Sequence, residues 1–171
     1  AGIGQVVDVQ RPVPGLVVHD VELSEPVAVG DEARAVVDAP NRAGACQAHS
    51  ATHVIHAALR ELVGPTAVQA GSFNRPGYLR FDFSASHGLS EELKREIEER
   101  ANEAIRDGLQ VTDQQMPLEQ AKAMGAMAMF GEKYPPIVRV VEMGGPWSRE
   151  LCGGTHVFNT AQIGVLNLVG E

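Results

Sequence analysis

One predicted helix carries a row of histidines beside a row of apolar residues. Residues 44–63 are rich in alanine, leucine, histidine and charged side chains, and Gly64-Pro65 ends the segment. An apolar row recurs every four residues along it, formed by Val54, Ala58 and Leu62. On a second row, His49 and His53 stand one helical turn apart, so that their imidazoles point the same way and suit one metal ion. The pair is also common by chance, so it predicts a site only together with further ligands.

A second group of ligand-type side chains lies near the C-terminus. Cys152-Gly-Gly-Thr-His156 offers a thiolate and a third imidazole, and its glycines let the backbone turn sharply beside a crowded ion. With His49 and His53 they form a mixed nitrogen and sulfur set that is typical of Zn²⁺. The competing interpretation is a packed histidine helix with a buried structural cysteine. Ser50 stands where the zinc-peptidase motif His-Glu-x-x-His has its catalytic glutamate, so we do not expect peptidase chemistry.

Two further side chains on the same helix could approach this site. His56 extends the histidine row, and we expect it to pack or to contact a ligand rather than to bind the metal. Cys46 could replace a ligand, but a core thiol is the expected role.

Composition limits the kind of protein. The chain has 171 residues, of which 44% are hydrophobic and 21% charged, so it can bury a core without disulfides. With only two cysteines, we expect a reducing compartment, the cytoplasm. No apolar run approaches the roughly 20 residues that span a bilayer. The net charge of −8 predicts no broad basic face, so a nucleic acid would be held by other domains or only at a terminus. Because the first residue is Ala1 rather than Met, we expect a piece of a longer protein.

The order of elements predicts an α+β fold, with helices packed on a mainly antiparallel sheet. Residues 1–40 read as short strands and turns that form a small β-barrel-like subdomain, and residues 41–171 form the domain with the metal site. The expected strands are residues 4–9, 15–21, 27–29, 33–37, 67–73, 78–83, 110–113, 137–143 and 163–169. The expected helices are residues 44–63, 90–105, which Ser90 caps, and 117–124.

Several ordered segments resemble one known family. They are His49-Ser-Ala-Thr-His-Val-Ile-His-Ala-Ala-Leu-Arg60, Gln69-Ala-Gly-Ser72, Leu79-Arg-Phe-Asp-Phe83, Gly125-Ala-Met-Ala-Met-Phe-Gly-Glu-Lys-Tyr134, Glu150-Leu-Cys-Gly-Gly-Thr-His156 and Thr160-Ala-Gln-Ile-Gly164. In this order they are similar to the editing domain of alanyl-tRNA synthetases, and residues 1–40 resemble the β-barrel before it. The resemblance covers essentially the whole chain.

The resemblance implies a function and a set of site residues. The family hydrolyses serine or glycine from wrongly charged alanine tRNA, because an alanine pocket excludes these amino acids too weakly. It implies His49, His53, Cys152 and His156 as Zn²⁺ ligands, and Gln69, Cys152 and His53 as catalytic residues, with Gln69 lining the pocket. The implied partners are the 3′-terminal aminoacyl-adenosine of alanine tRNA and the other domains of the same synthetase. No membrane is involved.

Three functions and two roles of zinc stay open at this point. The chain is predicted to be an alanine-type editing hydrolase, a threonyl-type editing domain or a non-catalytic zinc-stabilised tRNA-binding module. Zinc chemistry on the ester needs a vacant coordination position, whereas four protein ligands close the shell. Glu132 and Lys133 are expected in a loop that either approaches the tRNA terminus or faces solvent. Arg80 and Asp82 are expected on the solvent side of a strand whose phenylalanines point inward.

Overall fold

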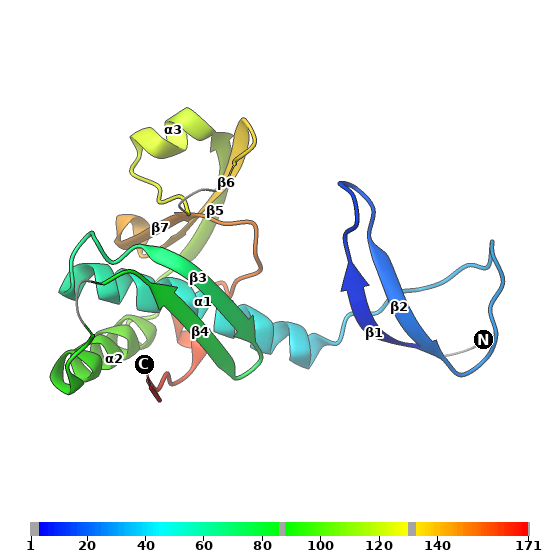
Figure 1. Cartoon of the computed structure of the whole chain (residues 1–171), viewed down its shortest axis with the longest axis horizontal. Helices are drawn as coiled ribbons and strands as arrows, with labels where there is room; N and C mark the ends of the chain where they lie inside the picture. Colours follow the sequence, from blue (N-terminus) through cyan, green and yellow to red (C-terminus); the bar gives the residue numbers. More distant parts are fainter. Residues whose placement is uncertain (1–3, 86–87, 130–132, 171) are drawn as a thin grey trace. The chain divides into compact units, whose positions relative to one another are not determined.

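The computed structural model describes residues 4–85, 88–129 and 133–170 (Figure 1). The chain divides into two compact units, residues 1–36 and residues 37–171. The regular elements among the described residues are helices and antiparallel sheets, which confirms the predicted α+β class. Within these residues, every helix is too short or too polar to span a lipid bilayer.

The first unit contains a single antiparallel pair of strands among its described residues. β1 (Gly4–Gln10) pairs with β2 (Val18–Leu23), and almost every side chain of the pair is exposed. The strands predicted at residues 27–29 and 33–37 are wrong, since both segments are irregular or turn. A two-stranded pair buries little apolar surface, so the valines of residues 27–29 and 33–37 would gain little burial by joining it as further strands.

The second unit begins with the long helix α1 (Ala39–Leu62). It starts before the predicted residue 44 because the Asp38 carboxylate accepts a hydrogen bond from the Asn41 backbone N–H at 2.9 Å. Pro40 lies in the first turn, where its missing N–H costs nothing. The predicted boundary at Pro40-Asn41 therefore lies inside the helix.

The remaining elements form two sheets and two further α-helices. A hairpin of β3 (Gln69–Arg75) and β4 (Tyr78–Phe83) lies on α1 (Figure 1). A three-stranded antiparallel sheet has the order β5 (Val111–Pro117), β6 (Ile137–Met143), β7 (Ser148–Leu151). The other helices are α2 (Glu91–Arg106), α3 (Leu118–Ala123) and the 3₁₀ turns η1 (Gly145–Trp147) and η2 (Thr160–Ile163). As predicted, Ser90 caps α2, accepting from the Leu93 N–H at 3.1 Å.

The main core lies between α1, α2 and the strands that follow them. Val54 and Ala58 of the predicted apolar row are fully buried against Ile97 and Ala101 of α2. Burial of these side chains holds α1 in place, and with it the histidine row on its neighbouring face.

The strand predicted at residues 163–169 is wrong. Residues 160–163 form η2, and the segment after it has no regular structure. The backbone of Leu166 instead bonds to the side chain of Asn102, whose amide both donates to its carbonyl and accepts from its N–H. A side chain of α2 thus takes the place of a neighbouring strand.

Candidate metal centre

Two elements far apart in the sequence meet at the predicted ligand set. α1 supplies His49 and His53, and the loop after β7 supplies Cys152 and His156. The four candidate ligand atoms all lie within 4.8 Å of one another. The Cys152 sulfur lies 3.5 Å from His49 Nε2 and 3.3 Å from His156 Nε2. Tetrahedral zinc with ordinary bond lengths holds sulfur and nitrogen about 3.5 Å apart, so the donor set fits this ion.

The loop that carries Cys152 is shaped by a glycine and an arginine. A Cβ added at Gly154 would lie 1.8 Å from His49 Cε1, so any other residue would displace the His49 ring, whereas Gly153 faces open space. Arg139 of β6 donates from one guanidinium nitrogen to the carbonyls of Cys152, at 3.2 Å, and Gly154, at 2.6 Å. These charge-assisted bonds hold the loop against the sheet.

Ser50 contacts the candidate ligand His156 from the opposite side. It is fully buried, and its hydroxyl oxygen lies 3.2 Å from His156 Nδ1. The same oxygen accepts from the Val157 backbone N–H at 3.1 Å. With Nδ1 facing the hydroxyl, Nε2 of His156 is directed to the ligand group. Ser50, whose presence argues against a peptidase, therefore supports the candidate metal site.

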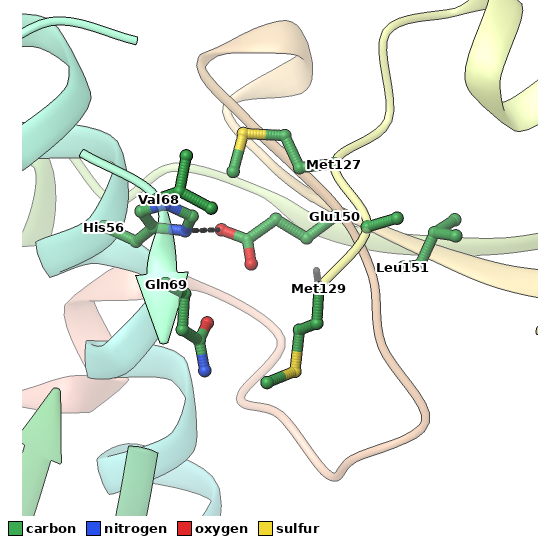
Figure 2. A pocket seen from close by; sticks show the side chains of 8 residues that line it. His56, Val68, Gln69, Met127, Met129, Glu150 and Leu151 are labelled. Atoms are coloured by element: carbon green, nitrogen blue, oxygen red, sulfur yellow. Dashed lines mark hydrogen bonds and ion pairs between the residues drawn. The ribbon is translucent and has the colours of Figure 1, made fainter. Parts of the chain in front are cut away.

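Glu150 joins two histidines of α1. One carboxylate oxygen lies 3.2 Å from His53 Nδ1, as an ion pair, and the other lies 3.0 Å from His56 Nδ1. Figure 2 shows the carboxylate between its strand and the ring of His56. A carboxylate on Nδ1 fixes the ring of a metal-binding histidine and leaves Nε2 for the metal. No role was predicted for Glu150 from the sequence, although Glu150 begins the family-like segment and lies two residues before Cys152.

The charges of the site suit a cation even before one binds. Burial by itself raises the pKa of the Cys152 thiol, but hydrogen bonds from His156 and His49 outweigh it and lower that pKa to about 3. Burial likewise disfavours a charged His53, yet the Glu150 carboxylate raises the pKa of His53 to about 10. Contact with His53 and His56 holds the pKa of Glu150 well below its usual range, against the effect of burial. Burial lowers the pKa of His156. A thiolate therefore stands ready among the imidazoles.

A pocket opens beside Glu150, as Figure 2 shows. Its polar lining is Gln69, His56 and Glu150, and its apolar lining includes Val68, Met127, Met129 and Leu151. Gln69, predicted as catalytic, begins β3 and donates from its amide to Ser72 Oγ at 3.1 Å. The other two predicted catalytic residues, Cys152 and His53, lie in the ligand group itself. The carboxylate of Glu150 thus lies between the ligand group and the pocket that holds Gln69.

The remaining candidates lie outside the ligand group. Cys46 is a half-buried free thiol that does not belong to the described cluster. Phe81 and Phe83 pack against the core while Arg80 and Asp82 pair on the outer face of β4, as predicted. Lys133 is exposed, and Glu132 lies outside the described residues.

Comparison with known proteins places these residues in a wider context. A family model described as "Threonyl and Alanyl tRNA synthetase second additional domain" matches residues 138–171. The chain is 73% identical over 167 residues to an alanine–tRNA ligase of Cutibacterium acnes, covering 98% of this chain and 19% of the relative. It is 58% identical over 168 residues to the ligase of the same name from Clavibacter michiganensis subsp. michiganensis, with 98% and 19% covered. The chain therefore spans about a fifth of the length of these relatives.

Proposed function

Because the chain belongs to the alanyl-tRNA synthetase family, we propose that it hydrolyses the ester of alanine tRNA wrongly charged with serine or glycine. The observation that carries the proposal is the closed group of His49, His53, Cys152 and His156 beside a pocket lined by Gln69. The three nitrogens and one thiolate fit Zn²⁺. When bound, zinc would polarise the ester carbonyl or lower the pKa of a water.

The chain's own residues have separable roles in this proposal. Glu150 and Ser50 hold the rings of His53 and His156 so that their free nitrogens face one point. Gln69 lies on the wall of the pocket, where its amide can orient the 3′-terminal aminoacyl-adenosine. The other domains of a full-length synthetase would hold the tRNA body in the cytoplasm, since this chain carries a net charge of −8.

A deacylation assay tests the proposal. Zinc-loaded chain is incubated with alanine tRNA carrying serine, glycine or alanine, and with threonine tRNA carrying serine. We expect release of serine and glycine from alanine tRNA only. Cys152→Ala should abolish both hydrolysis and zinc binding, while Cys46→Ala, which removes a thiol outside the ligand group, should change neither. Gln69→Ala should keep the zinc and lose activity on the order of 10²-fold, the cost of a substrate misplaced by about 1 Å.

The other outcomes distinguish the competing functions. Hydrolysis of serine from threonine tRNA would indicate a threonyl-type domain. A non-catalytic zinc module is favoured by one observation, namely that four protein donors fill a tetrahedral shell. In that case the wild-type chain would hydrolyse none of these esters, and Cys152→Ala would lower its melting temperature.

A further inference from the structure

The hairpin of β3 and β4 places two aromatic and two basic side chains on one face. Phe73 pairs across the hairpin with Arg80, and Arg75 pairs with Tyr78. Residues two apart on a strand share a face, and directly paired residues share it too. The four side chains therefore form a two-by-two array, which we call the hairpin face.

The opposite side of the hairpin is turned toward α1, and this fixes the hairpin face outward. Phe81 lies with its ring centre 5.0 Å from that of His56, and Leu79 packs against the main core. Asn74 reaches Thr52 of α1, with 2.7 Å between its side-chain oxygen and the threonine hydroxyl. Figure 1 shows both strands lying along α1. The alternate residues must then point to solvent.

The rings of the hairpin face are unusually open for aromatic side chains. Phe73 is 51% exposed and Tyr78 is 43% exposed, and their ring centres lie 6.4 Å apart. The guanidinium carbon of Arg75 lies 5.1 Å from the centre of the Tyr78 ring. Flat rings and a stacked guanidinium are what single-stranded nucleic acids use as a platform for their bases.

The charge of the hairpin face differs from that of the chain. The whole chain carries −8, whereas this face carries Arg75 and Arg80 against one aspartate, Asp82. Asp82 lies 3.0 Å from the Arg80 side chain and partly neutralises it. A local positive charge between aromatic rings favours a phosphate backbone over an apolar protein surface.

The position of the hairpin face relates it to the pocket. β3 begins with Gln69, on the pocket wall, and Phe73 follows four residues later, about 13 Å along the strand. An irregularity in the pairing between Gln69 and Gly71 turns Gln69 to the face of Phe83 and Phe73 to the outer face. A strand of RNA whose last residue lies at the mouth of the pocket would cross the edge of the hairpin to reach this face. We propose that the hairpin face binds the single-stranded 3′ end of the tRNA, a role that rests on the proposed function of the pocket.

Binding of a short RNA tests this proposal. The probe is a fluorescently labelled single-stranded RNA of about eight nucleotides, within the range of ordinary single-strand sites. Phe73→Ala and Tyr78→Ala should each weaken its binding about 5- to 150-fold, the effect of losing one stacked base. Phe158→Ala, which removes an aromatic ring 79% exposed elsewhere in the unit, is the matched control and should change nothing.

A salt titration supplies a second measurement, in which the substituted residue is a surface arginine rather than an aromatic ring. Arg75→Gln should reduce the slope of log affinity against log salt by about 0.7, one phosphate contact to a single strand. Arg95→Gln, on the exposed side of α2, should leave the slope unchanged. Because Arg75 is a surface side chain, this arm remains informative if an aromatic variant fails to fold.

The outcomes separate this proposal from the proposed function. If the hairpin variants bind RNA like the wild type, or if the wild type binds no RNA, the hairpin face is not an RNA site, and a protein domain becomes its expected occupant. Hydrolysis of seryl-tRNA by the wild type would still stand in that case. If RNA binding depends on the hairpin face but no ester is hydrolysed, the proposed function fails, while the assignment of the hairpin face as an RNA site stands.

Discussion

Replacing Glu150 with glutamine removes one charge from the wall between the pocket and the ligand group. The carboxylate of Glu150 accepts a hydrogen bond from His56 Nδ1 at 3.0 Å, and its other oxygen forms an ion pair with His53 Nδ1 at 3.2 Å. Glutamine keeps the shape but has only one oxygen, so its amide nitrogen must face one of the two ring N–H groups. Either His53 or His56 then loses the oxygen atom that holds its ring in place.

The size of the effect follows from the burial of this contact. The Glu150 side chain is only 12% exposed, so water replaces the lost interaction poorly. A hydrogen bond to a charged group contributes about 1.5–3 kcal/mol, and about 1.4 kcal/mol is a factor of ten in affinity. We therefore expect Glu150→Gln to weaken Zn²⁺ binding about 10- to 100-fold, the range found when such supporting partners are removed.

Competition with a chromophoric chelator measures the zinc affinity, and the visible spectrum of the Co²⁺-loaded chain reports the geometry of the ligands. Glu142→Gln is the matched control, because Glu142 is a partly buried glutamate of the same sheet that pairs with Arg149 instead. Circular dichroism checks the fold, and Glu150→Asp is used if the glutamine variant is unfolded. A folded variant whose zinc affinity lies within twofold of the wild type would refute the reasoning, as would an equal loss in Glu142→Gln.

Three further predictions concern the same centre. Zinc binding at about pH 8 should release about one proton, from His53, because the Cys152 thiol is already ionised. Calorimetry in two buffers of different ionisation enthalpy counts the protons that are released. Release of two or more protons would contradict a preformed thiolate. Gly154→Ala should displace the His49 ring and weaken zinc binding at least about tenfold, as chelator competition would reveal. Arg139→Lys should free the loop carbonyls and speed zinc loss to a chelator about 10-fold; unchanged kinetics would show that the loop holds itself.

Local sequence signals predicted the helices and strands whose caps and backbone hydrogen bonds do not depend on a distant side chain. Ser90 caps α2 as predicted, and β4 and β6 span the predicted residues. The predictions failed where a distant partner decides the conformation. The segment 163–169 has strand-like composition, but the side chain of Asn102 satisfies its backbone. An unpaired apolar segment becomes a strand only if another edge is free to pair with it.

By itself, the sequence determined which atoms can form the metal centre. The spacing of His49 and His53 follows from the pitch of a helix, and Gly153-Gly154 lets the backbone turn between Cys152 and His156. Only the tertiary structure decided how those atoms are held. Glu150 and Ser50 act on rings that lie about a hundred residues away in the chain, with separations of 94 for Glu150 and His56 and 106 for Ser50 and His156. No periodicity carries information over such separations, because contacts of this kind arise only when the packed core brings the helix and the last strand together.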